Sequence, residues 1–330
     1  MAAAFCPGLR RRGPWRDRRA RGRIACNMTH RREPAEAPSG DDPHSPIAPL
    51  LHFDGGEFDG GSAQAAFRVT HALCGHPLFE LERLVRLSKE LSPRLVEYNP
   101  GSLPVIHDPS TTPANSLSVA ETIRRIETCG SWMVLKHVER SPEYGALLDR
   151  CVDEVAAAAG LDPAKLIRRA AFLFVSSPGA ITPLHLDPEN NFLLQIRGEK
   201  AMHIARPGNR AVIGERALER FFSGGHRNVL LDEDLHDHLS RFELGPGDGV
   251  FVPMPAPHYV HNGDNVSISF SATFHTLETD TTQGVYWIND KLRRLGMRPA
   301  PPGVQASADR RKHAIYKSLR AIKRRLPPRR

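Results

Sequence analysis

The sequence lacks any long hydrophobic run, and no stretch approaches the roughly 18 apolar residues that make a transmembrane helix a candidate. Its cysteines are few, odd in number and scattered, with no CxxC pair. They are Cys6, Cys26, Cys74, Cys129 and Cys151. This usage argues against a disulfide scaffold and against a thiolate zinc site, and it is typical of a reducing compartment. We therefore expect a cytoplasmic protein that does not span a membrane.

Acidic residues are almost missing from both ends of the chain. Residues 1–32 hold ten arginines and one acid, Asp17, whereas residues 310–330 hold ten lysines or arginines and no acid. The net charge of +8 therefore divides into +9 and +10 at the two ends and −11 over residues 33–309. Basic ends of this kind attract RNA, anionic lipid or acidic protein without specificity. We interpret them as solvated, disordered tails, with weak contact to nucleic acid as the alternative.

The N-terminal segment also lacks the apolar core of a secretory signal. Its helix-breaking residues Pro7, Gly8, Gly13 and Pro14 fit a transit peptide poorly. Translation from Met28 instead of Met1 explains the segment at least as well. Residues 33–63 are rich in Pro, Gly, Asp and Ser, which is typical of a linker. We predict a disordered basic tail and linker over residues 1–63.

The rest of the chain has the periodicity of a mainly β protein with flanking helices. Helical spacing and capping signals predict helices at 79–91, 118–126, 141–160, near 215–222 and at 283–295. Short apolar runs between turn signals predict strands at 132–138, 171–175, 183–187 and 250–252, and hairpins of 191–196 with 200–205 and of 258–261 with 266–274. We interpret 206–243 as an irregular, charged insertion around the helix near 215–222. Short strands with helices at both ends favour a double-stranded β-helix, the jelly-roll or cupin architecture.

The segment Thr182-Pro-Leu-His185-Leu-Asp187 carries the strongest chemical signal. Side chains alternate along a strand, so His185 and Asp187 are expected to face the same way. Together with His258, which follows 71 residues after Asp187, they have the order of a two-histidine, one-carboxylate triad. Such a triad binds Fe(II) and leaves coordination positions open.

The third ligand is a choice between His258 and His261. Residues three apart on a strand point to opposite faces, so only one of them can face the metal. The five-residue spacing from Pro253 favours His258. We do not expect His203, His226, His236, His238 or His275 to be ligands, because a lone strand histidine is more often a hydrogen-bonded core residue and the other three lie in the charged insertion.

In blocks 182–206 and 246–274 the sequence resembles the JmjC-type, cupin-like Fe(II)/2-oxoglutarate oxygenases, especially the small hydroxylases related to the asparaginyl hydroxylase that inhibits the hypoxia-inducible factor. The resemblance is looser over residues 65–295. It implies that His185, Asp187 and His258 ligate Fe(II). It also implies that Lys200 pairs with the distal carboxylate of 2-oxoglutarate and that Thr182 bonds the same end.

Asn191 would lie near the other end of the cosubstrate. On the resemblance we divide the rest of the chain into a cupin-like JmjC domain with N-terminal helices over 64–278 and a C-terminal helix with a basic tail over 279–330. A similar C-terminal helix in the resembled hydroxylases builds a dimer, which implies a homodimer. Each assigned residue has a simpler alternative: Lys200 as an exposed hairpin lysine, and Thr182 and Asn191 in capping or core roles.

Two positions depart from the resembled pattern. Met202 stands where an aromatic residue is usual, and Ala256-Pro257 replaces an aromatic pair before the distal histidine. Both changes concern the lining of the pocket, so they bear on substrate identity.

We therefore expect an Fe(II)- and 2-oxoglutarate-dependent oxygenase, a hydroxylase of a protein, a peptide or a small molecule. Two alternatives stay open. One is a non-catalytic, cupin-like ligand sensor or transcription-associated regulator. The other is a metal-dependent cupin that does not use 2-oxoglutarate, which would have no need of a cation at the position of Lys200.

Overall fold

The computed structural model describes residues 48–53, 63, 65–106, 116–229 and 236–325, all of them within one compact unit, Ala48–Arg330. Of the tail and linker predicted over residues 1–63, all but residues 48–53 and 63 lie outside the described residues. None of the described helices is long and apolar enough to cross a membrane.

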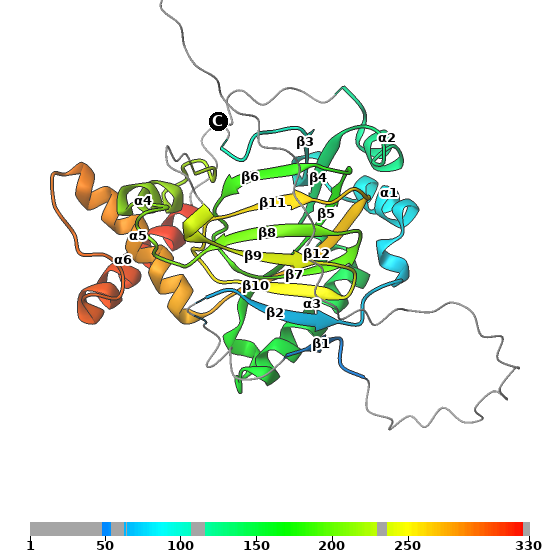
Figure 1. The fold of residues 1–330 in the computed structure, drawn as a ribbon. Coiled ribbons are helices and arrows are strands. Elements are labelled where there is room, and N and C mark those ends of the chain that lie inside the picture. The colour runs from blue at the N-terminus through cyan, green and yellow to red at the C-terminus, as the bar shows by residue number, and fades with distance from the viewer. Residues whose placement is uncertain (1–47, 54–62, 64, 107–115, 230–235, 326–330) are drawn as a thin grey trace, which may run out of the picture. The chain divides into compact units, whose positions relative to one another are not determined.

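Two antiparallel sheets make up the centre of the molecule (Figure 1). The larger sheet has the order β1-β2-β10-β7-β12-β5-β4-β3 and the smaller one the order β6-β11-β8-β9. The strands of the larger sheet are β1 (Leu51–His52), β2 (Phe67–His71), β3 (Val96–Pro100), β4 (Ser131–Lys136), β5 (Ile167–Ser176), β7 (Asn190–Arg197), β10 (Asp248–Val252) and β12 (Ser267–His275). Those of the smaller sheet are β6 (Ile181–His185), β8 (Lys200–Ala205), β9 (Leu239–Leu244) and β11 (His258–Asn262).

From β5 to β12 the chain passes back and forth between the two sheets, with β8 and β9 as the one consecutive pair in a single sheet. This winding is that of a double-stranded β-helix, and it confirms the predicted fold class. It also makes both predicted hairpins wrong. The turn after β7 leads into β8 of the other sheet, and the turn after β11 leads into β12 of the other sheet. Each turn closes the end of the barrel instead of joining two paired strands.

The two sheets pack face to face and bury an apolar layer between them. Its members come from both sheets and are Leu193, Met202, Ile204, Leu244, Val250, Val252, Ala256 and Val260. Along β7 the alternate residues Phe192 and Leu194 point the other way, into the main core beneath the helices. Strand β7 is buried on both faces over nearly its whole length, with an apolar run at Phe192–Leu194 and with Asn190, Asn191 and Gln195 as buried polar residues.

The helices pack on the larger sheet or gather at one end of the barrel, where the last three lie together (Figure 1). They are α1 (Leu81–Glu90), α2 (Val119–Arg124), α3 (Pro142–Ala158), α4 (Glu215–Phe222), α5 (Leu277–Arg294) and α6 (Ala306–Arg325). Ser118 and Glu121 form the predicted capping box of α2. Helix α5 begins earlier than predicted, behind a second capping box of Thr276 and Thr279.

Two elements differ from the sequence-based expectation. Strand β9 lies inside the segment 206–243, which the sequence marks as irregular, because β9 is an edge strand with most of its charged side chains in solvent. Helix α6 forms in the segment expected to be a solvated basic tail. It packs on α5, where Tyr316 is buried against Gly284; a Cβ at Gly284 would come within 2.8 Å of the Tyr316 ring.

Candidate metal centre

His185, Asp187 and His258 come together at one end of the barrel. His185 is the last residue of β6, and His258, the first residue of β11, is its register partner. Asp187 lies two residues beyond the end of β6. Its position is therefore set by the turn after the strand and not by the strand alternation that the sequence suggests. One donor atom from each of the three side chains lies within 4.8 Å of the other two. The rings of His185 and His258 have centroids 4.2 Å apart.

Backbone carbonyls fix the orientation of both imidazoles. Nδ1 of His185 lies 2.8 Å from the carbonyl oxygen of Pro183, and Nδ1 of His258 lies 2.9 Å from that of Ala256. A carbonyl oxygen can only accept, so each Nδ1 donates, and in a neutral ring this leaves the lone pair on Nε2. The two Nε2 atoms lie 3.9 Å and 3.6 Å from the carboxylate oxygens of Asp187. Outer partners of this kind hold histidines ready for a metal.

The surroundings of the triad favour the ligand forms of its side chains. Burial, helped by the neighbouring imidazole of His258, lowers the pKa of His185 to about 3, so this ring is neutral at physiological pH. For Asp187, burial raises the pKa, but His185, His258 and Arg227 outweigh it and the net pKa is lowered. The site therefore offers an ionised carboxylate beside a neutral imidazole, which are the forms that ligate a divalent metal.

This donor set fits a redox-active divalent ion. Two imidazole nitrogens and one carboxylate oxygen are the ligands of the non-haem Fe(II) centres, in which further positions remain for exogenous ligands. Within the ranges that the structure describes, no other group of three or more histidines, cysteines or acids gathers in this way. His203, His226, His238 and His275 are not members of this group.

Lys200 lies inside the barrel and not on its surface. It opens β8 opposite Asn262 of β11, on the same face as Met202 and Ile204, and is 6% exposed. The alternative of an exposed hairpin lysine is therefore wrong. Burial lowers the pKa of its ammonium to about 7, and no acidic side chain of the described residues forms an ion pair with it. A buried cation without a counter-ion is costly unless it binds an anion.

Asn191 and Thr182 also face the barrel interior. Asn191 lies on β7 between Val252 and Thr273, on the same face as Leu193. It is buried, and its Oδ1 accepts no hydrogen bond from the described residues. Thr182 is the register partner of the inward-facing Val260, beyond a bulge in β6. The buried Oδ1 of Asn191 is therefore an acceptor that a polar ligand would satisfy.

Sequence reasoning missed a group of residues on the other side of His185. A small cavity of about 50 Å³ beside this histidine is lined by Trp132, Arg227 and Asn228 among others. The indole Nε1 of Trp132 is buried and has no hydrogen-bond partner among the described residues. Trp132 belongs to β4, which reaches the site only through its pairing with β5. No local motif marks it, and the sequence predicts only a strand over residues 132–138.

No family model matches the sequence. Among solved structures, two of the protein YcfD from Escherichia coli are similar at 18% identity, one described as the ribosomal oxygenase YcfD. The matches cover 80% and 77% of this chain and 65% and 62% of those chains, with TM-scores of 0.42 and 0.39. A third YcfD structure, in complex with cobalt and 2-oxoglutarate, has 18% identity, covers 73% of this chain and 56% of that chain, and has a TM-score of 0.39. The chain thus spans between 56% and 65% of the length of these neighbours.

Proposed function

We propose that the protein is an Fe(II)- and 2-oxoglutarate-dependent oxygenase that hydroxylates a C–H bond of a protein, peptide or small-molecule substrate. The observation that carries the proposal is the convergence of His185, Asp187 and His258, with both imidazoles held by backbone carbonyls so that each Nε2 points to one place. These three side chains are the ligands we assign to the metal.

The interior of the barrel supports 2-oxoglutarate as cosubstrate. A 2-oxo diacid needs one end at the metal and a cation for its distal carboxylate. Lys200 is the buried cation, and the hydroxyl of Thr182 is assigned to the same end. The unsatisfied Oδ1 of Asn191 is assigned to the end near the metal, where the described residues leave it without a donor. A plain metal cupin or a sensor without this cosubstrate would gain nothing from a buried ammonium.

Fe(II) with bound 2-oxoglutarate supplies the oxidising power for hydroxylation by O2, and succinate and CO2 are the coproducts. The chain's own residues do the rest. The carbonyls of Pro183 and Ala256 hold the ligand rings in place. Lys200 orients the cosubstrate, and the apolar layer around Met202 and Val260 keeps water from the reacting atoms.

The proposal is tested by succinate formation. Full-length protein with Fe(II), 2-oxoglutarate and ascorbate in aerated buffer is expected to form succinate slowly even without the prime substrate. Asp187→Ala should abolish this turnover, whereas Asp149→Ala, which removes an exposed carboxylate of helix α3 that pairs with Arg169, should not. Succinate formation no faster than that of Asp187→Ala would reject the oxygenase function.

We also propose that the protein is a homodimer through its C-terminal helices. Exposed large apolar side chains are concentrated there: Leu277, Leu295, Met297, Val304, Ile315, Leu319 and Ile322. A set of this kind marks an interaction surface. Light scattering at graded concentrations is expected to give twice the chain mass, and Ile315→Asp combined with Leu319→Asp should give the single-chain mass. A monomeric parent protein would contradict this assembly.

The described cysteines, Cys74, Cys129 and Cys151, are free, which agrees with a reducing, cytoplasmic location. The basic residues of α6 support weak, non-specific contact with nucleic acid.

A further inference from the structure

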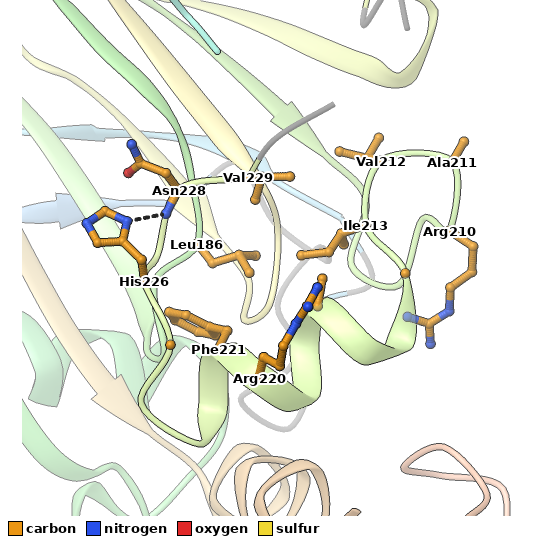
Figure 2. Close-up of a pocket in the computed structure, with 13 residues that line it drawn as sticks. Leu186, Arg210, Ala211, Val212, Ile213, Arg220, Phe221, His226, Asn228 and Val229 are labelled. Carbon is orange, nitrogen blue, oxygen red and sulfur yellow. Dashed lines mark hydrogen bonds between the residues drawn. The ribbon is translucent and has the colours of Figure 1, made fainter. Parts of the chain in front are cut away.

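A second cavity lies on the outer side of the metal centre. It has a volume of about 380 Å³ and is enclosed by the segment 210–214, helix α4 and the segment 226–229 (Figure 2). The volume is in the range of ligand pockets, which run from about 300 to 1,000 Å³.

The walls of this cavity are largely apolar. Leu186, Val212, Ile213 and Val229 are buried, and all four line it. Leu186 lies between the metal ligands His185 and Asp187 in the sequence. An apolar side chain bound here would therefore rest against the chain that carries the metal ligands.

Two arginines stand in the lining, but only one is neutralised. Arg210 is paired with Glu215. Arg220 forms no ion pair with the part of the chain that the structure describes. Figure 2 shows its side chain extending from α4 toward Ile213, across the cavity from His226 and Asn228. An apolar cavity with one unneutralised guanidinium suits an apolar group that has a carboxylate beside it.

The cavity adjoins the space beside the metal centre. His226 and Asn228 line both this cavity and the small cavity next to His185. Asn228 forms a β-bridge with His185, and the amide of Leu186 donates to the carbonyl of Arg227 at 3.0 Å. A polypeptide with one residue at the metal would cross His226 and Asn228 and reach the second cavity with a neighbouring residue.

We propose that this cavity binds the flank of a polypeptide substrate, taking an apolar side chain on Leu186 and Ile213 and an adjacent acidic side chain on Arg220. That the bound polypeptide is a substrate rests on the proposed oxygenase function, whereas its binding to the cavity does not. Residues 33–309 carry a net negative charge, which disfavours the binding of acidic peptides in general. A preference for an acidic side chain would therefore have to come from this cavity.

Selection from a displayed library of random dodecapeptides on immobilised full-length protein tests the proposal. The expected consensus is an apolar residue next to Asp or Glu. Arg220→Glu should lower the affinity for the selected peptides by about tenfold or more, because a charged hydrogen bond is replaced by repulsion between two carboxylates. Arg216→Glu is the matched control, because Arg216 is exposed on the same helix and lies outside the cavity lining; it should leave binding unchanged. Ala217→Phe, which fills the cavity, should weaken binding as well.

Each other outcome overturns the proposal. A consensus without acidic residues, or one that is bound equally by Arg220→Glu, removes the role of Arg220. If no peptide is enriched while octanoate binds in a manner that depends on Arg220, the occupant is a small apolar carboxylate. These readouts need no turnover. Peptide binding without succinate formation would therefore reject the oxygenase function alone, and succinate formation without peptide enrichment would reject the subsite alone.

Discussion

Lys200 and His258 point into the barrel from the same face of two paired strands. His258 is the register partner of Ile204, and Lys200 is that of Asn262, so the ammonium and the imidazole start four residues apart along the sheet. At about 3.3 Å per residue this is roughly 13 Å of backbone. A lysine side chain that reaches back along the barrel leaves room over that length for a short dicarboxylate. The pairing of β8 with β11 thus sets the distance between the metal end and the cation.

Lys200→Met is expected to separate cosubstrate binding from metal binding. The substitution keeps an unbranched chain but removes the charge, so the dissociation constant for 2-oxoglutarate should rise by about 100-fold, whereas that for Mn(II) should stay within about threefold. Calorimetric titration of the two ligands measures both. Equal loss of metal binding would mean that Lys200 holds the structure of the site instead of the cosubstrate.

The same variant is expected to be more stable than the parent protein in the absence of ligands. A buried ammonium without a counter-ion destabilises the fold, so its replacement by an apolar side chain should raise the free energy of unfolding by about 1–3 kcal/mol. Denaturant unfolding at neutral pH measures the difference. A less stable Lys200→Met protein would indicate that the ammonium has a structural partner.

Binding of 2-oxoglutarate is expected to weaken as the pH rises. Burial lowers the pKa of Lys200 to about 7, and only the protonated ammonium attracts the distal carboxylate. Above pH 7 binding must therefore take up a proton, and the dissociation constant should rise by up to about tenfold per pH unit. Between about pH 7 and the ordinary lysine pKa, the unfolded chain binds more protons than the folded one, so this group makes stability rise with pH. Titrations from about pH 6 to about pH 9 on Mn(II)-loaded protein test the first effect, and Lys200→Met should lack both.

Of the two histidines of β11, only His258 is expected to contribute to metal binding. His258 is buried at the metal centre, whereas His261 is exposed and pairs with Ala201 on the outer face. His258→Ala should lower the affinity for Mn(II) or Fe(II) by about 100-fold or more, and His261→Ala should leave it unchanged. Metal titration of both variants makes the comparison. A loss in His261→Ala would contradict the strand register.

The core behind β7 and β12 is expected to dominate stability. Phe270 is fully buried on the outer face of the larger sheet, against Phe79 at a ring distance of 5.7 Å. Phe270→Ala should lower the free energy of unfolding by about 3–5 kcal/mol. Phe242→Ala, at a half-buried position on β9, is the control and should cost clearly less. Similar losses in both variants would mean that the barrel edge matters as much as the core.

Local signals in the sequence predicted local structure well. The capping box of Ser118 and Glu121, the start of α3 at Pro142 and the helix Glu215–Phe222 all form where short-range patterns put them. Pairing of strands was predicted poorly, because a turn such as Arg197-Gly-Glu looks the same whether it joins two partners in a sheet or crosses to another sheet. Strand β9 was missed since an edge strand keeps charged residues at alternate positions.

The candidate site followed the same division. The HxD segment and His258 could be found from spacing. The position of Asp187 in the turn after β6 could not, because strand alternation also predicts that Asp187 lies on the same side as His185. The burial of Lys200 depends on which face of β8 points inward, and the register with β11 decides that. Trp132 and Arg220 reach their cavities only through packing of segments far apart in the chain, so no short pattern marks them.

The most direct test of the central claim is an anaerobic titration of Fe(II)-loaded, full-length protein with 2-oxoglutarate, followed by visible absorption. A 2-oxo acid that chelates Fe(II) in this site is expected to give a weak charge-transfer band that saturates at one equivalent and is absent from His185→Ala and Asp187→Ala. Folded, iron-loaded protein that binds 2-oxoglutarate without this band, or does not bind it at all, would contradict the assignment of the triad and Lys200 to a single oxygenase site.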